Sequence, residues 1–523
     1  MSGEKKSAER DEKGEEFLSS TPWKKMSTTS SISSKANEYF DELVNRVTGN
    51  LEGDDLIRVI WLSSTLFFIV GGYWLLRSLK DPIMSVINGV EYIPSAKIAS
   101  LFVVFGLVIV YNKLLDIFPK HQLFYMMGCG YGVLFFIMGL LLLHPTMGLS
   151  NANADPYRFL GWVSYVTIES FGSMVVQCYW ALVNSSVDLQ FAKKNFGLIV
   201  AGAQIGSILG PTLATQADVI GIPTLYLTGG LIMFLMVGAM HFYIQKFGAP
   251  GAEEEESKKK DPKKSGKEEG IMEGFYLFWE HDYVKGIFVV SSVYMVQVTI
   301  VDYMMKVLAK ERYALMYPDD PQKAVRSFAS FMGYFGQTTN SISFLFSLFG
   351  TGMVIKKFGL TNTLIAFPVL LLICTVLVWI WPDIWMVFTV MMIMKGMSYA
   401  LNNPTKEILY QMTSTNIKFK CKSWIDTFGQ RSAKATGSLV TNAFASSVAD
   451  LTNYGSMVGV LSGAFLIWVS MYMGKKFEEL HDSGEKVGEP SRAYENSVLQ
   501  AEVEDTSCSS VEEGQDDKEH KNP

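Results

Sequence analysis

Residues 58–82, RVIWLSSTLFFIVGGYWLLRSLKDP, decide the fold class of this chain. Eighteen uncharged residues separate Arg58 from Arg77. As a helix, they are long enough to cross a bilayer core about 30 Å thick. Arg77 and Lys80 follow the apolar run, and Pro82 is expected to end the helix. The stretch therefore predicts a membrane-spanning helix that carries charge beyond its apolar part.

Charge-free stretches of similar length recur along the chain. Apolar residues make up 49% of the sequence and charged residues 18%, against about 25% charged in a typical soluble chain. We therefore predict an all-α polytopic membrane protein with twelve transmembrane helices in two six-helix halves, as in major-facilitator carriers. The predicted helices cover residues 57–77, 93–112, 122–143, 158–184, 195–214, 222–245, 284–308, 328–355, 360–381, 383–402, 423–448 and 454–474.

Polar segments divide the chain into five expected regions. They are a disordered N-terminal tail (1–55), a six-helix bundle (56–245), a charged linker (246–283), a second six-helix bundle (284–476) and a disordered C-terminal tail (477–523). Lys and Arg gather in alternate loops, in the linker and in both tails. The positive-inside rule therefore places the linker and both termini in the cytoplasm.

A faint internal repeat supports the division into halves. Residues 180–184, WALVN, resemble residues 399–403, YALNN, and fall in the fourth and tenth predicted spans. Parallel repeats of this kind are typical of carriers whose solute site lies between the two halves.

The motifs of several other function classes are missing from the sequence. No G-x-x-x-x-G-K-[ST] loop occurs, which argues against an ATP-hydrolysing pump. Five scattered cysteines and six histidines form neither a disulfide framework nor a metal-ligand pattern. We find no catalytic triad pattern. We therefore expect no enzyme activity, no metal, no cofactor and no nucleic-acid partner.

Charged residues inside apolar runs are the candidate functional residues. A charge at mid-membrane costs about 2.5–3.5 kcal/mol on insertion scales, so it usually faces a polar cavity. Arg77 and Lys80 share a helical face, and they either hold a phosphate or carboxylate group or snorkel to the membrane surface. Glu169 lies near the middle of the fourth predicted span. It either forms a gate or cation-coupled site, or pairs structurally with a cation on another helix.

Further charges lie in the second half. Asp302 and Lys306 are four residues apart, so they form a local ion pair, or Asp302 alternates as the partner of a lysine that releases solute. Lys395 follows eleven uncharged residues and needs an anion nearby. Either the solute or a carboxylate such as Glu169 can supply it.

Residues 404–438 are the richest polar block. Lys406 lies at its start, Lys422 belongs to a group of lysines that is also a topology signal, and Arg431 and Lys434 are three residues apart on a helix of small residues. The candidate substrate-binding residues are therefore Lys80, Arg77, Glu169, Asp302, Lys395, Lys406, Lys422, Arg431 and Lys434.

From about residue 58 to residue 475 the chain resembles the ATP/ADP translocase family, the nucleotide transporters of plastids and obligate intracellular parasites. Three segments carry most of the likeness: LRSLKD at 76–81, ESFGS at 169–173 and PTKE at 404–407. A looser fourth segment, KSWID at 422–426, leads into the cations of the eleventh predicted span.

The resemblance also implies roles for individual residues. A lysine in the first span and a glutamate in the fourth matter for transport in that family, and they correspond to Lys80 and Glu169. A seventh-span acid corresponds to Asp302, although relatives have glutamate there. A lysine before the eleventh span corresponds to Lys422, where Cys-Lys-Ser replaces the family's Gly-Lys-Ala.

The implied function is import of ATP in exchange for ADP by alternating access, with the phosphates held by buried Lys and Arg between the halves. The alternative is a cation- or proton-coupled symporter of another nucleotide or organic anion. The expected partners are ATP and ADP as transported solutes and the lipid bilayer, and a monomer is compatible with the sequence. The tails are most like the microsporidian branch. That branch implies the cell membrane of an intracellular parasite or, alternatively, the membrane of a reduced mitochondrion-like organelle.

Overall fold

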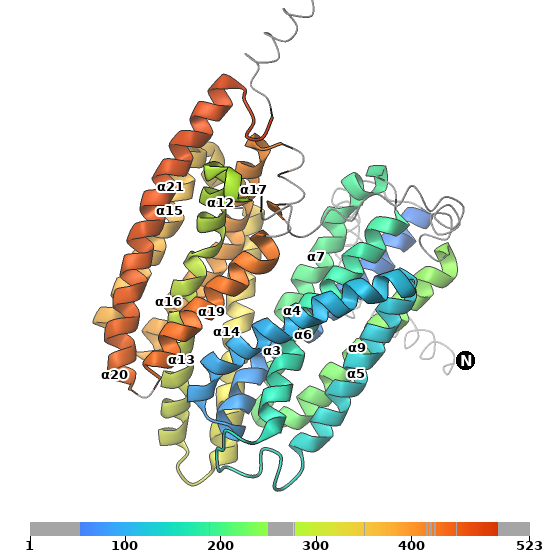
Figure 1. Ribbon diagram of the computed structural model, residues 1–523. Coiled ribbons are helices and arrows are strands. Elements are labelled where there is room, and N and C mark those ends of the chain that lie inside the picture. Colours follow the sequence, from blue (N-terminus) through green and yellow to red (C-terminus); the bar gives the residue numbers. More distant parts are fainter. Residues whose placement is uncertain are drawn as a thin grey trace, which may run out of the picture.

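The computed structural model describes residues 53–187, 189–248, 276, 278–349, 351–414, 417, 421–422, 425–445 and 447–489. These residues form helices joined by short connections, with one isolated β-bridge between Thr413 and Val487. The long helices form two groups that lie side by side (Figure 1). The expected all-α membrane fold is confirmed.

The first group contains the helices before residue 248. They are α3 (Asp54–Ile87), α4 (Ile93–Ile117), α5 (Lys120–Leu142), α6 (Phe159–Ser186), α7 (Leu189–Ala214), the short α8 (Ala217–Ile220) and α9 (Ile222–Phe247), with the 3₁₀ turn η2 (Val90–Tyr92) between α3 and α4.

The second group contains the helices from residue 282 onward. They are α12 (Asp282–Ser292), α13 (Tyr294–Met316), α14 (Pro321–Phe349), α15 (Thr351–Ile380), α16 (Ile384–Met397), the π-helical η4 (Ser398–Asn402), α17 (Asn403–Leu409), the 3₁₀ turn η5 (Tyr410–Met412), the π-helical η7 (Ile425–Gly429), α19 (Gln430–Ala443), α20 (Val448–Asp450), the π-helical η8 (Leu451–Gly455) and α21 (Ser456–Ser483).

Ten helical segments among the described residues are long and apolar enough to cross a membrane. They match ten of the twelve predicted spans. Helices α14 and α19 occupy the positions of the eighth and eleventh predicted spans, but neither is among these ten segments.

Three predicted helix boundaries differ from the structure. Helix α3 does not end at Pro82 but continues to Ile87. Proline removes a single backbone donor, and neighbouring helices and hydroxyl side chains commonly compensate for this in membrane helices. Helix α21 extends to Ser483, beyond the end predicted at residue 474. Helix α15 begins at Thr351 and kinks at Gly359, where φ is 78°.

Glycines let α3 and α7 pack backbone to backbone. A Cβ added at Gly210 of α7 would lie 2.1 Å from the carbonyl oxygen of Gly71 in α3, and one at Gly206 would lie 2.5 Å from the carbonyl oxygen of Phe67. Gly202, Gly206 and Gly210 recur every four residues on one face of α7. This is the small-residue pattern that permits close helix packing in membranes, and it fixes α3, which carries Arg77 and Lys80.

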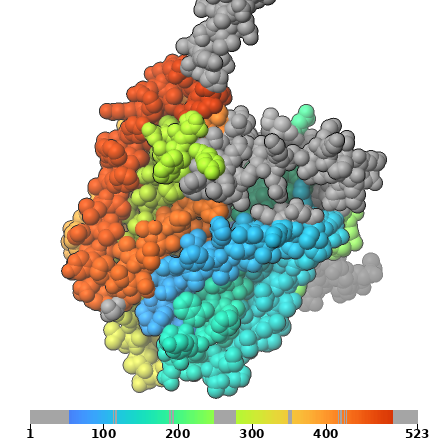
Figure 2. Space-filling view, viewed as in Figure 1, coloured from blue at the N-terminus to red at the C-terminus, as the bar shows by residue number. Residues whose placement is uncertain are grey.

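The two groups also contact each other. Ser327 of α14 donates a hydrogen bond to Asp218 of α8 at 3.0 Å, and Asn340 of α14 donates one to the carbonyl oxygen of Ser207 in α7 at 2.6 Å. Helices α4 and α19 run along each other on the face shown in Figure 2, where Ser95 contacts Asn442 at 3.2 Å. These contacts join the two groups.

Candidate functional site

A cavity of about 260 Å³ lies between the two groups of helices. Helices α3, α4 and α6 line it from the first group, and α13, α16, η4 and α19 line it from the second. The lining residues are Tyr73, Trp74, Arg77, Lys80, Lys97, Ser100, Leu101, Glu169, Gly172, Ser173, Met295, Val298, Thr299, Asp302, Lys306, Lys395, Ser398, Tyr399, Gln430, Arg431 and Lys434. Both groups therefore contribute cations to one polar space.

One face of α3 supplies the first set of polar side chains, because residues three or four apart along a helix share a face. The guanidinium of Arg77 donates to the hydroxyl of Tyr73 at 2.5 Å and lies 5.3 Å from the ring centroid of Trp74. The carboxylate of Glu169 in α6 lies opposite, at 2.6 Å from the Lys80 ammonium and 4.0 Å from Arg77. Arg77 and Glu169 therefore belong to the same charged cluster.

The structure rules out snorkelling for Lys80. Its side chain is only 3% exposed, and its ammonium lies 3.9 Å from the ring centroid of Tyr165 in addition to its bond with Glu169. The helix continues past Pro82, so Lys80 is placed inside the protein and not at a helix end. The ion pair between Lys80 and Glu169 matches the structural alternative for Glu169, and it also borders the cavity.

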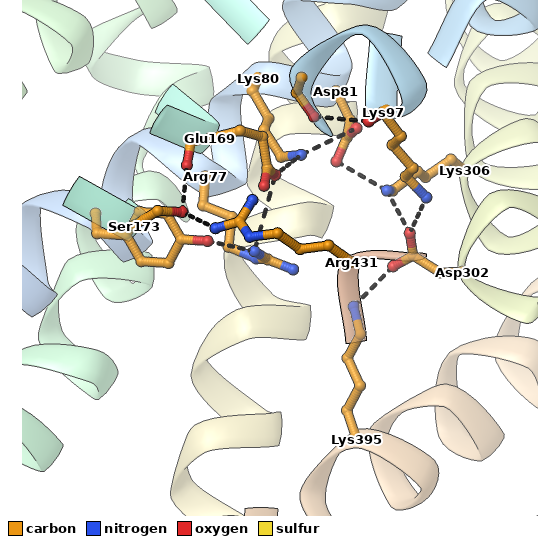
Figure 3. A network of polar contacts seen from close by, with 12 residues as sticks. Arg77, Lys80, Asp81, Lys97, Glu169, Ser173, Asp302, Lys306, Lys395 and Arg431 are labelled. Carbon is orange, nitrogen blue, oxygen red and sulfur yellow. Dashed lines mark hydrogen bonds and ion pairs between the residues drawn. The ribbon is translucent and has the colours of Figure 1, made fainter. Parts of the chain in front are cut away.

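Asp302 of α13 is the centre of a second charged cluster (Figure 3). Its Oδ2 accepts from Lys306 at 2.5 Å and from Lys97 at 3.0 Å, and its Oδ1 accepts from Lys395 at 2.7 Å. Lys306 also reaches Asp81 at 3.0 Å. The local pair between Asp302 and Lys306 is therefore present, but it is one part of a network that joins three lysines.

The protein partner expected for Lys395 needs correction. Glu169 was the carboxylate suggested by the sequence, but the structure pairs Glu169 with Lys80 and pairs Lys395 with Asp302. Lys395 and Asp302 come from neighbouring helices of the second group, whereas Glu169 lies in the first. A carboxylate in the same bundle is the nearer partner.

Helix α19 supplies two further cations. Arg431 donates a hydrogen bond to the hydroxyl of Ser173 in α6, which joins the two groups across the cavity (Figure 3). Lys434 lines the same cavity. The π-helical turn η7 directly precedes α19, and the π-helical turn η4 follows Lys395 on α16. Such turns are frequent at functional sites because they shift which side chains face inward.

Two predicted site residues lie outside the cavity lining. Lys422 pairs with Glu407 at 2.5 Å, and both side chains are partly exposed. Lys406 is buried in α17, about two helical turns beyond Tyr399, which lines the cavity. The physical reason is the path of the chain: among the described residues of this stretch, the cavity lining ends at Tyr399 and resumes at Gln430.

The sequence reasoning missed three charged residues of the network. Lys97 was a single charge within the second predicted span, so the criterion used for Lys395 applied to it equally. Asp81 follows Lys80 directly but was not singled out. Lys306 was considered only as a local partner of Asp302, yet its bond to Asp81 links the two halves.

The charge balance of the site strongly favours an anionic ligand. Arg77, Lys80, Lys97, Lys306, Lys395, Arg431 and Lys434 line the cavity. Against these seven cations stand three carboxylates, Glu169, Asp302 and the adjoining Asp81, which leaves four positive charges in excess. Within the described ranges no group of three metal-ligating side chains occurs. A polyanion with several phosphate groups matches such a site better than a singly charged solute.

The family model described as "TLC ATP/ADP transporter" matches residues 34–478. The chain belongs to this family. The protein is therefore a transporter, an integral, multi-pass membrane protein and not an enzyme, as expected. ATP and ADP are the solutes of the family.

Relatives from three groups of organisms resemble this transporter over most of their length. A protein of Chlamydia pneumoniae named "ADP,ATP carrier protein 1" is 24% identical over 504 residues, covering 85% of this chain and 95% of the relative. "ADP,ATP carrier protein 2, chloroplastic" of Arabidopsis thaliana is 23% identical, covering 80% and 74%. "ADP,ATP carrier protein 1" of Rickettsia bellii is 22% identical, covering 88% and 100%.

Solved structures of other transporters share the fold. A bacterial homologue of the iron transporter ferroportin in an inward-facing state aligns with a TM-score of 0.58 at 12% identity, covering 81% of this chain and 100% of that one. A peptide transporter in complex with sulfate aligns with a TM-score of 0.55 at 12% identity, covering 80% and 95%. At these identities the likeness concerns the fold alone, and it agrees with two helical groups around a central cavity.

Proposed function

We propose that this transporter imports ATP in exchange for ADP by alternating access, and that Lys and Arg of both helical groups hold the phosphates in the central cavity. Family membership supports the exchanged nucleotides. The observation that carries the site assignment is the excess of four formal positive charges in the cavity between the groups. ATP carries about four negative charges near neutral pH, so it can neutralise this excess.

Cations from both helical groups would contact the phosphates of one bound nucleotide. Arg77 and Lys80 come from the first group, and Lys395, Arg431 and Lys434 come from the second. Phosphate oxygens accept strong, charge-assisted hydrogen bonds from such groups. A ligand held from both sides draws the two groups together, which is the condition for rocking one half against the other.

The aromatic side chains of the cavity are suited to the nucleotide base. Tyr73, Trp74 and Tyr399 line the cavity beside the cations. Arg77 already lies against the rings of Tyr73 and Trp74. Stacking of a base on an aromatic ring contributes about 1–3 kcal/mol and tolerates changes of base. We assign the base to this aromatic side and the phosphates to the lysine side.

Obligate exchange follows from the same charges. An empty cavity keeps its excess positive charge, and moving that charge through the low-dielectric centre of the membrane is unfavourable. Bound ATP removes the excess and bound ADP removes most of it, so the loaded transporter reorients more readily than the unloaded one. We further propose that residues 56–245 and 284–476 move as the two bodies, with the linker at 246–283 between them.

The cellular setting belongs to the same proposal. The lysine and arginine distribution supports cytoplasmic termini. The polar, acid-containing N-terminal segment supports the microsporidian branch and a location in the cell membrane of an intracellular parasite, with a reduced mitochondrion-like organelle as the alternative. Antibody labelling of tags at both ends, before and after permeabilisation, tests the orientation. Labelling of intact cells would contradict it.

Uptake by proteoliposomes tests the proposed function. Labelled ATP should enter vesicles that contain ADP much faster than vesicles that contain only buffer. An imposed proton or sodium gradient should not replace internal ADP. Equal uptake with and without internal ADP would contradict exchange, and uptake driven by a cation gradient would favour a symporter.

A further inference from the structure

We propose that Asp302 is an internal counter-anion that occupies the place of a nucleotide phosphate when no nucleotide is bound. We further propose that Lys97 is a phosphate-binding residue, which pairs with Asp302 in the absence of ligand and with a phosphate group in its presence. This inference rests on the proposed function and adds one residue, Lys97, to its site. In this inference Asp302 does not bind the nucleotide but competes with its phosphates for the lysines. A carboxylate repels phosphate, so its presence at the centre of a cation cluster needs an explanation.

The geometry around Asp302 resembles that expected around a phosphate group. Its two oxygens accept from three ammonium groups, at 2.5 Å from Lys306, 2.7 Å from Lys395 and 3.0 Å from Lys97. These donors converge from three different helices, α13, α16 and α4 (Figure 3). Three converging ammonium groups are more than one carboxylate needs for neutralisation, but they suit a group with several anionic oxygens.

The three lysines are not equally available to a ligand. The side chain of Lys306 is 3% exposed, and it has a second carboxylate partner, Asp81, at 3.0 Å. Lys306 would therefore stay paired if Asp302 moved away. All three lysines line the cavity, but the side chains of Lys97 and Lys395 are more exposed, at 15% and 10%. We therefore assign Lys306 a structural role in pairing with Asp81. We assign Lys97 and Lys395 the role of binding either Asp302 or a phosphate group of the ligand.

Lys97 differs from Lys395 in the helical group to which it belongs. Lys395 and Asp302 lie in the same group, but Lys97 is on α4 of the other group. The bond between Lys97 and Asp302 at 3.0 Å is therefore a bridge between the two halves. When a phosphate group binds Lys97, the ion pair between Lys97 and Asp302 breaks, and the ligand bridges the two halves in its place. Binding is thereby linked to a contact that must change when the halves move.

Ligand binding to the purified full-length protein in detergent tests the competition directly. The probes are ATP and inorganic tripolyphosphate, measured by titration calorimetry. If Asp302 competes with phosphate, Asp302→Asn should lower the Kd of both probes by at least about tenfold, because a bound anion no longer has to be displaced. The exchange rate at saturating ATP should fall in the same variant, since release becomes slower.

A second variant keeps the test decisive if Asp302→Asn does not fold. Lys97→Gln should raise the Kd of both probes at least about tenfold, since one charge-assisted contact is lost. In the double variant, the tightening caused by Asp302→Asn should be much smaller than in the single variant, because one of the freed lysines is missing. Asp54→Asn is the matched control, because Asp54 pairs with Lys246 at 3.1 Å on the exposed surface. The Kd of this variant for both probes should equal that of the wild type.

The opposite results would overturn the inference without affecting the proposed function. A purely structural bridge predicts that Asp302→Asn weakens binding and that the double variant restores it. An unchanged Kd in Lys97→Gln would remove Lys97 from the site. In either case wild-type exchange in proteoliposomes would continue to depend on internal ADP. Tightening for ATP but not for tripolyphosphate would show that Asp302 acts on the base and not on the phosphates.

Discussion

Lys80 is the residue whose removal should affect transport most clearly. It is buried, and its ammonium is held by Glu169 at 2.6 Å beside the cavity. Lys80→Gln removes one proposed phosphate contact and leaves the carboxylate without its main partner, which costs about 2–5 kcal/mol for buried charge pairs. ATP/ADP exchange by proteoliposomes should therefore fall at least about thirtyfold at equal protein content. Lys246→Gln, at an exposed ion pair with Asp54, is the control and should retain exchange. A Lys80→Gln rate near that of the control would contradict the site.

Lys422 should behave differently from Lys80. The resemblance to the family singles it out, but the structure pairs it with Glu407 outside the cavity lining. We expect Lys422→Gln to leave the Kd for ATP within about twofold of the wild type, because a partly exposed ion pair contributes about 0–1 kcal/mol. Calorimetric titration of the purified variant measures this. A large rise in Kd would show that residues near 422 enter the site when nucleotide binds.

Single charges in apolar runs were a sound guide to the cavity, but they did not predict its pairing. Lys80, Asp302 and Lys395 were found because mid-membrane charge is rare, and Lys97 could have been found in the same way. Which lysine meets which carboxylate depends on helices that are distant in sequence. Lys80 and Glu169 are 89 residues apart, and Lys395 and Asp302 are 93 apart. No spacing rule within one helix reaches that far.

At the scale of helices, the packing of α3 against α7 should be sensitive to a single methyl group. Gly210→Ala would place a Cβ 2.1 Å from a backbone oxygen of α3, so the helices must move apart. We expect a loss of about 1–3 kcal/mol in stability, as in other overpacked sites. The midpoint of thermal unfolding of the detergent-purified protein should fall accordingly.

Gly197→Ala is the control on the same helix, since a Cβ there meets no atom within 4 Å. Alanine favours helix over glycine by about 1 kcal/mol, so this variant should unfold at an equal or higher temperature. Equal destabilisation by the two substitutions would mean that α3 and α7 are not packed as described.

Helix positions were largely predictable from the sequence, whereas helix irregularities were not. Runs of uncharged residues mark where a helix can cross the bilayer. The π-helical turns next to Lys395 and Gln430 have no such signal, because they depend on packing against neighbouring helices. The continuation of α3 past Pro82 has the same origin. These irregular turns decide which charges face the cavity, so the site could be predicted only in part.

At the scale of the whole molecule, alternating access requires the contact between α8 and α14 to open. Ser327 and Asp218 are joined at 3.0 Å across the two groups. In a background without the native cysteines, the pair Asp218→Cys and Ser327→Cys should form a disulfide on oxidation. Exchange should then fall below about a tenth of the reduced rate, because the halves are locked at this end. Reductant should restore it.

Each single cysteine variant controls for the chemistry of oxidation and should keep its exchange rate. Full exchange by the cross-linked protein would contradict movement of the halves at this contact. The division into two halves was predictable from the span count and the faint repeat. The side-chain contacts that join the halves were not, since they combine residues such as Asp218 and Ser327 from helices of unrelated sequence.

The most direct measurement is an experimental structure of the transporter with ATP bound. The account predicts that the phosphates lie between the halves, within hydrogen-bond distance of Lys80 on one side and Lys395 on the other, with the base beside Trp74. Nucleotide density outside this cavity, or phosphates that contact neither lysine, would contradict it.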